Sequence, residues 1–245
     1  MVLQAEEGLL TTSAGPRVLV ATAVPPERDA VAQAFPALEP APGIAHGPVS
    51  PDVLAVGVGP ARAAAHTAAA LTAAALRGAP YDLVVSAGIA GGFAPHAPLG
   101  CLVLADEITA ADLGADTADG FLPVTDLGFG VVTHRPPGPL VRAVADATGA
   151  RTGTVLTVCT VTGTAARAAA LRARHPRALA EAMEGFGVAE AAAAHGVPVL
   201  ELRAVSNPVG PRDRAAWRIG DALTALTEGF GKLTPVLESW KPHDQ

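Results

Sequence analysis

Residues 183–206 read MEGFGVAEAAAAHGVPVLELRAVS, and this stretch decides the fold. Its first half, from about Glu184 to His195, is rich in alanine, and Gly196 is a typical helix stop. Its second half, from Pro198 to Val205, is an apolar run of the length of a buried strand. A helix that leads directly into a buried strand is typical of α/β proteins.

The same alternation continues on both sides of this stretch. We expect strands at 17–22, 52–58, 82–86, 101–108 and 152–160, and helices at 27–35, 60–77, 140–148, 165–174 and 214–232. Continuous apolar strands indicate a sheet that is covered on both faces. The sequence therefore predicts an α/β fold, a three-layer α/β/α sandwich with a central mixed, partly parallel twisted sheet.

Two segments between these elements are expected to be irregular. The glycine-rich residues 87–92 are predicted to form a turn after the strand 82–86. Residues 109–139 are rich in Asp, Gly, Thr and Pro, and a loop of that length in a compact domain is usually a lid or a partner-binding segment.

Length and composition exclude several classes of protein. The chain has 245 residues, half of them apolar, which suits a single domain over residues 17–240 after an N-terminal extension at 1–16. Its net charge of −6 is spread along the chain, so a nucleic-acid partner is not expected. The longest apolar stretch contains proline and charged residues, so we expect no membrane span. The extension lacks the pattern of a secretory signal, and the two cysteines suit a reducing compartment, so a cytoplasmic protein is expected.

Several common site motifs are missing or incomplete. Gly57-Val58-Gly59 follows a strand as in dinucleotide-binding proteins, but Arg62 occupies the third glycine position. The histidines do not fall at zinc-ligand spacing on one helix face, and no serine lies in a Gly-x-Ser-x-Gly motif. We expect no cofactor and no metal.

Three groups of polar residues follow predicted strands, where ligands bind in open α/β sheets. Glu27 is the only carboxylate just after the first strand, and Met183-Glu184 precede a helix. Ser206-Asn207-Pro208 follow the strand of the deciding stretch. Each carboxylate also has a simpler interpretation, since an acidic residue at a helix N-terminus favours the helix dipole. Asn207 before a proline is likewise a common turn residue.

In the order and spacing of these groups the chain resembles the nucleoside phosphorylase/nucleosidase superfamily. Met183-Glu184-Gly185, then Gly196-Val197-Pro198, then residues 203–206 (RAVS) are similar to its MEG, GVP and RAIS signature. The segment 86–92 resembles the family's glycine-rich turn under the sugar, which implies that Gly88 and Ile89 contact the substrate. The resemblance covers residues 17–233.

Within that family, the resemblance implies hydrolysis. Phosphorylases hold phosphate with charge-assisted donors, but Ser86 and Ile89 stand at two of those positions, and Arg28 is the only basic candidate near the first turn. Glu27 resembles the glutamate with which nucleosidases orient and deprotonate a water. A 6-oxopurine nucleoside phosphorylase and a catalytically silent nucleoside-binding protein remain the alternatives.

Asn207 indicates that the base is a 6-oxopurine, hypoxanthine or guanine. Adenine-cleaving nucleosidases have Asp there, whereas an asparagine amide donates to a 6-oxo group and accepts from a protonated N7–H. Asparagine cannot deliver a proton, so the donor is either solvent or Asp213. The resemblance also implies that Glu184 binds the ribose hydroxyls, that Met183 packs on the sugar and that the backbone near Val161 lines the base.

Residues 206–218 (SNPVGPRDRAAWR) resemble a subgroup of these nucleosidases. Its members cleave hypoxanthine from a nucleoside that carries a benzoate-like carboxylate beyond the ribose, in an alternative route to menaquinone. Arg212, Arg214 or Arg218 could pair with that carboxylate, because a guanidinium fork suits it. The family also implies a small-molecule nucleoside substrate and a homo-oligomer, a dimer or larger.

Overall fold

The computed structural model describes residues 15–35 and 51–241, and the predicted extension at 1–16 lies almost entirely outside them. In these residues a mixed sheet of eight strands runs in the order β10-β4-β8-β9-β3-β1-β2, with β7 paired to β4. The strands of this sheet are β1 (Val18–Thr22), β2 (Asp52–Ala55), β3 (Leu83–Gly92), β4 (Leu102–Ala110), β7 (Thr133–His134), β8 (Arg151–Thr157), β9 (Ala178–Ala182) and β10 (Val199–Pro208).

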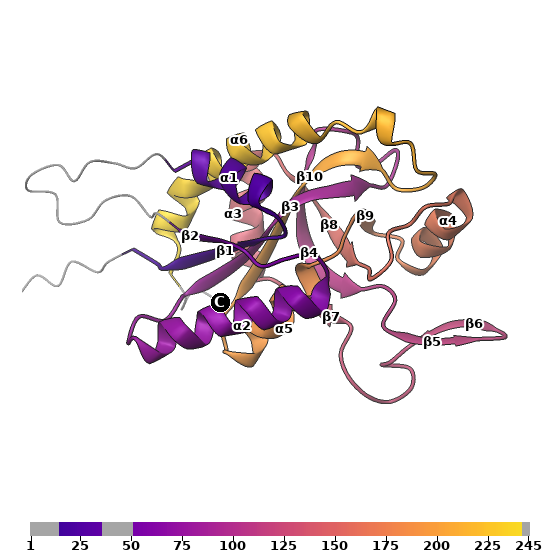
Figure 1. Cartoon of the computed structure of the whole chain (residues 1–245), viewed down its shortest axis with the longest axis horizontal. Helices are drawn as coiled ribbons and strands as arrows, with labels where there is room; N and C mark the ends of the chain where they lie inside the picture. Colours follow the sequence, from indigo (N-terminus) through magenta and orange to yellow (C-terminus); the bar gives the residue numbers. More distant parts are fainter. Residues whose placement is uncertain (1–14, 36–50, 242–245) are drawn as a thin grey trace, which may run out of the picture.

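Helices cover both faces of the sheet, which confirms the predicted α/β architecture (Figure 1). On one face lie α2 (Pro60–Leu76) and α5 (Gly185–Ala194), and on the other lie α1 (Pro25–Gln33), α3 (Gly138–Thr148) and α6 (Ile219–Ser239). The helix α4 (Ala165–Arg174) connects β8 to β9. Among the described helices, none combines the length and apolarity that crossing a membrane requires.

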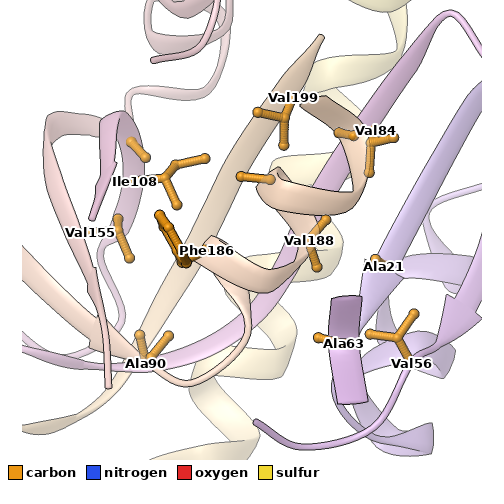
Figure 2. Packing of buried hydrophobic residues seen from close by; sticks show 14 of the residues in the cluster. Ala21, Val56, Ala63, Val84, Ala90, Ile108, Val155, Phe186, Val188 and Val199 are labelled. Carbon is orange, nitrogen blue, oxygen red and sulfur yellow. The ribbon is translucent and has the colours of Figure 1, made fainter. Parts of the chain in front are cut away.

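Strand alternation explains the two cores. Successive side chains of a strand point to opposite faces, so Leu19 and Ala21 of β1 join the core under α2 and α5, while Val18 and Val20 join the core under α1, α3 and α6. In the first core, Phe186 and Val188 of α5 pack against side chains of the sheet (Figure 2).

The sheet also closes on itself, which the sequence does not predict. β3 pairs in parallel with β1 over Leu83–Ala87 and with β10 over most of its length, and its last two residues pair with β9. Each strand in the series β10-β4-β8-β9 is also hydrogen-bonded to the next. These four strands and β3 therefore form a closed ring.

Four details of the predicted elements are wrong. Residues 87–92 are the second half of β3 and not a turn, because hydrogen bonds from β10 and β9 hold this glycine-rich segment extended. β2 ends at Ala55, three residues before the predicted end of the strand 52–58. It lies at the edge of the sheet, and its residues alternate between exposed and half-buried. β9 was missed because alanine and glutamate are weak strand formers. Residues 214–216 form a short 3₁₀ helix (η1) before α6.

The predicted irregular loop at 109–139 also contains regular structure. A hairpin of β5 (Gly114–Thr117) and β6 (Gly120–Pro123) projects from the body of the protein (Figure 1), and β7 returns to pair with β4. Its strands are short and contain glycine and aspartate, so they carry little sequence signal.

The contact between α2 and α5 gives a prediction about stability. A Cβ at Gly187 would overlap the backbone carbonyl of Pro60, so Gly187→Ala forces the two helices apart. We expect the free energy of unfolding to fall by roughly 1–3 kcal/mol in urea denaturation. The matched control is Gly231→Ala, at an exposed α6 position with open space around it, which should be neutral or raise stability by up to about 1 kcal/mol. Equal stability of the two variants would contradict the close packing.

Candidate active site

A cavity of about 550 Å³ lies beyond the ends of β1, β9 and β10. Its wall brings together residues from distant parts of the chain, including three buried glutamates. Of the residues that the sequence singled out, the wall contains Glu27, Ile89, Val161, Met183, Glu184, Asn207 and Arg214. A second cavity of about 310 Å³, beside α3 and α5, has no carboxylate among the described residues of its wall.

Glu27 sits in the first turn of α1 with its side chain buried between two chain segments. One carboxylate oxygen, Oε2, accepts hydrogen bonds from the backbone N–H groups of Ala23 (2.9 Å) and Val24 (3.2 Å), and so caps the helix. The other oxygen, Oε1, accepts from Ile89 N–H at 2.8 Å. Burial raises the pKa of this carboxyl, while the charge of Arg203 and the Ile89 bond lower it in part. The carboxylate is thus fixed in place at the cavity.

Gly88 allows this approach. A Cβ at position 88 would overlap Glu27 Oε1 and would lie 2.8 Å from Nη1 of Arg203. Gly88 is not part of the cavity wall. Its backbone lies against the side chains of Glu27 and Arg203.

Arg203 is almost completely buried and binds three neighbours. Its Nε donates to Glu201 Oε1 at 2.8 Å, Nη1 to Glu184 Oε2 at 3.4 Å and Nη2 to Ser86 Oγ at 3.0 Å. Burial by itself lowers the pKa of Arg203, but the carboxylates of Glu201, Glu184 and Glu27 outweigh it and raise the pKa above its usual value. The guanidinium is therefore charged, and three acids surround it.

Glu184 immediately precedes α5. Its Oε1 accepts from the N–H of Gly59 at 3.3 Å, and its Oε2 accepts from Arg203. It is the N-cap residue of α5, but its side chain makes no capping hydrogen bond to that helix. The carboxylate is held from two sides at the edge of the cavity.

Asn207 is also part of the cavity wall and lies near the end of β10. Its Oδ1 accepts from Ser206 Oγ at 2.9 Å, and its Nδ2 donates to the backbone oxygen of Pro208 at 3.0 Å. The Ser206 hydroxyl has a second contact, 3.3 Å from the carbonyl of Ala90. The amide therefore presents both a donor and an acceptor next to the cavity.

Besides Gly88, three of the predicted residues lie outside this wall: Arg212, Asp213 and Arg218. Asp213 accepts from Ala215 N–H at 3.1 Å and thereby caps η1. Together with Arg212 it lines a small adjoining cavity. Arg212 and Arg214 both lie over the ring of Trp217, at 5.5 and 5.9 Å from its centroid, but Arg214 faces the main cavity.

Sequence reasoning assigned no role to Glu181, Glu201 and Arg203, and noted Ser86 only as a missing phosphate ligand. Glu201 and Arg203 do carry a signal, because two charges within a strand that is buried on both faces need partners. Burial raises the pKa of Glu201, and the charge of Arg203 opposes that shift. Within residues 15–35 and 51–241, no three His, Cys, Asp or Glu side chains gather closely enough to hold a metal ion.

The fold and this site define a class of protein. Residues 18–233 match the phosphorylase superfamily, and the chain belongs to that family. Among solved structures it is similar to a 5′-methylthioadenosine/S-adenosylhomocysteine nucleosidase from Colwellia psychrerythraea, with a TM-score of 0.74 at 20% identity over 93% of this chain and 98% of the other. It is also similar to a futalosine hydrolase mutant from Helicobacter pylori, with a TM-score of 0.73 at 17% identity over 90% and 99%.

Two curated relatives narrow the class. A futalosine hydrolase of Streptomyces coelicolor is 78% identical over 93% of this chain and 99% of its own length. A futalosine hydrolase of Acidothermus cellulolyticus is 45% identical over 88% and 89%.

The Arg203 cluster predicts a stability that depends on pH. In Arg203→Leu, Glu201 loses the charge that opposes the burial shift, so its pKa rises further above the usual 4.5. A folded state that binds a proton more tightly than the unfolded state loses stability as the pH rises. We expect a loss of about 3–5 kcal/mol at pH 7 in urea denaturation and a smaller loss at pH 5.

Arg28→Leu is the matched control for this experiment. Among the described residues Arg28 pairs with its exposed neighbour Asp29 and with no other, so its loss should cost less than about 1 kcal/mol at both pH values. A loss for Arg203→Leu that is the same at pH 5 and pH 7 would show that no buried carboxyl depends on this guanidinium.

Proposed function

We propose that this chain hydrolyses the N-glycosidic bond of futalosine, with release of hypoxanthine and dehypoxanthine futalosine, in the futalosine route to menaquinone. The observation that carries the proposal is the cavity, whose wall contains the carboxylates of Glu27 and Glu184 together with the amide of Asn207. The 78% identity to a futalosine hydrolase over nearly the whole chain supports the same substrate.

The three side chains divide the reaction between them. Departure of the purine leaves an oxocarbenium-like sugar, which negative potential stabilises. Glu184 accepts hydrogen bonds from the ribose 2′- and 3′-hydroxyls, and Met183 packs on the sugar. Glu27 takes one proton from a water whose oxygen bonds to the anomeric carbon, while the electrons of the broken C–N bond leave with the base. A correctly placed general base contributes roughly 10²–10⁴-fold in rate.

The contacts of the basic residues favour hydrolysis over phosphorolysis. A phosphate dianion needs free charge-assisted donors. The Arg28 side chain instead points to exposed Asp29, and the Ser86 hydroxyl is bound by Arg203. Arg203 itself is surrounded by three acids. A dianion beside Glu27 would meet like-charge repulsion, whereas a water would meet an acceptor.

Asn207 selects the base in this proposal. Its amide N–H₂ donates to the 6-oxo group, and its carbonyl accepts from the protonated N7–H of the departing hypoxanthine. Asp213 caps η1 and is not among the residues that line the main cavity, so we assign the proton that reaches N7 to a solvent water.

The test is chromatography of futalosine and of inosine after incubation with the pure protein, with and without phosphate. We expect free hypoxanthine from futalosine at a rate that does not depend on phosphate and that exceeds the rate from inosine. A requirement for phosphate with a sugar 1-phosphate product would identify a phosphorylase, and binding without turnover would identify a silent nucleoside-binding protein.

Arg214 is expected to bind the distal carboxylate of futalosine, because it is the guanidinium in the cavity wall. Loss of a charge-assisted hydrogen bond in Arg214→Ala should raise KM for futalosine by roughly 10-fold or more and leave KM for inosine unchanged. Arg212→Ala is the matched control, since Arg212 lies over the same Trp217 ring but lines the adjoining cavity. Equal effects of the two variants on futalosine would contradict the assignment.

We also propose that the chain works as a homo-oligomer, a dimer or larger, through the segment that follows β4. Five large apolar side chains of this segment are exposed by 40% or more: Leu113, Leu122, Leu127, Phe129 and Val131. Exposed apolar side chains concentrated in one segment of a chain are typical of an interface between subunits.

Light scattering tests the oligomer. The wild-type mass should be at least twice that of one chain, and Phe129→Ser should lower it, because Phe129 is the most exposed of the five side chains. Leu76→Ser is the control, since Leu76 is 84% exposed at the end of α2, away from the hairpin. A monomeric wild-type protein would refute the interface.

We further propose a cytoplasmic location. Both cysteines are free, with Cys159 exposed and Cys101 half-buried. Exposed free thiols persist in a reducing compartment such as the cytoplasm. The proposed substrate also belongs to a class of intracellular metabolites.

A further inference from the structure

Glu181 is a buried carboxylate in the cavity wall that the reaction as described above does not use. Its side chain is 5% exposed and lines the cavity together with Asn207. In the sheet, Glu181 of β9 and Asn207 of β10 are both register partners of Gly91 in β3. Residues that pair directly across strands share a face of the sheet, so the two side chains flank a glycine on the same face.

Gly91 places no side chain of its own between them. A Cβ at this position would lie 3.4 Å from Asn207 Nδ2 and 2.9 Å from a methyl group of Val209. The strands that carry Glu181 and Asn207 are two strand spacings apart, roughly 10 Å. A flat bicyclic base with a hydrogen bond at each end matches a span of this length, beside Gly91 and Val209 in the same wall.

Among the residues that the structure describes, none forms an ion pair with Glu181, which acts as a hydrogen-bond acceptor. It accepts a hydrogen bond from Thr162 N–H at 2.8 Å and another from the Thr162 hydroxyl. The Arg167 guanidinium, whose charge acts on Glu181, pairs with Asp112 at 3.8 Å instead. Burial raises the pKa of Glu181, while its two hydrogen bonds from Thr162 and the charge of Arg167 lower it in part, and a further donor would lower it more. An ionised carboxylate has about four lone-pair sites, so two remain for a ligand.

We propose that Glu181 accepts a hydrogen bond from the N1–H group of the 6-oxopurine base and excludes 6-aminopurines from the site. This inference rests on the proposed function and names a second residue that reads the base. A 6-oxopurine carries a hydrogen on N1, whereas a 6-aminopurine has a lone pair there. Glu181 also occupies the Thr162 N–H, which could otherwise donate to that lone pair.

Glu181 and Asn207 together then match the whole edge of hypoxanthine. Asn207 donates to the 6-oxo group and accepts from N7–H, and Glu181 accepts from N1–H. A 6-aminopurine would place its N1 lone pair against a buried carboxylate, and such a mismatch costs roughly 10⁴–10⁵ in rate in sites built to hydrogen-bond their ligand. The negative charge near N1 also favours proton uptake at N7 as the base departs.

Calorimetric titration of the free bases tests this without turnover. The wild-type protein should bind hypoxanthine roughly 10–100-fold more tightly than 1-methylhypoxanthine, in which a methyl group replaces the N1 hydrogen. In Glu181→Gln, hypoxanthine affinity should fall by roughly 10-fold and the preference for hypoxanthine over adenine should shrink. The matched control is Glu190→Gln, because Glu190 is a glutamate of α5 that binds His134 outside this cavity.

Each outcome decides the matter. Equal wild-type affinity for hypoxanthine and 1-methylhypoxanthine would overturn the inference, and this comparison stands even where Glu181→Gln does not fold. A Glu181→Gln protein that loses hypoxanthine and adenine affinity equally would show that Glu181 only supports Thr162. Turnover of futalosine by the wild type is measured in parallel. If it fails while the hypoxanthine preference holds, the hydrolase proposal falls and the reading of N1–H remains.

Discussion

The guanidinium of Arg203 lies between β10 and β3, and its nitrogens reach Glu201, Glu184 and Ser86. These partners come from the interiors of two strands and from the start of α5, so one charged group joins the sheet to the helix that carries the site. Charges buried this deeply are tolerated only when they are paired and hydrogen-bonded. The position of Glu184 at the cavity therefore depends on a cation that does not itself line it, and the charge of the same cation acts on Glu27.

The closed ring of strands makes this arrangement possible. β3 runs beside β1 for its first half and beside β10 along most of its length, and it meets β9 only at its last two residues. The ends of β1, β9 and β10 are thereby gathered around the glycine-rich half of β3. Small residues are needed there, because Glu27, Arg203 and Asn207 all approach its backbone closely.

The polarity of the cavity follows from its backbone contacts as much as from its side chains. Several N–H groups around the cavity are already bonded to carboxylates: those of Ala23, Val24 and Ile89 to Glu27, that of Gly59 to Glu184, and that of Thr162 to Glu181. The carboxylates of Glu27, Glu184 and Glu181 consequently give the site acceptors and negative potential. The Asn207 amide adds both a donor and an acceptor. Such a surface suits a developing sugar cation and a base rich in N–H donors, and it does not suit a phosphate dianion.

The sequence by itself determined the alternation of strands and helices, the covered sheet and the polar residues just beyond strand ends, because these are properties of local periodicity and of short motifs. Glu27, Glu184 and Asn207 could be singled out in this way. β9 and the extended glycine-rich half of β3 could not, since their residues form strands only when partners from distant segments supply the hydrogen bonds. Only the tertiary structure decided that Glu201 faces Arg203, that Glu181 faces the cavity and that Asp213 and Arg212 face another one. The physical reason is that the partner of a buried charge, such as Ser86 for Arg203 at a separation of 117 residues, is set by strand register and by the closure of the sheet, which no local pattern records.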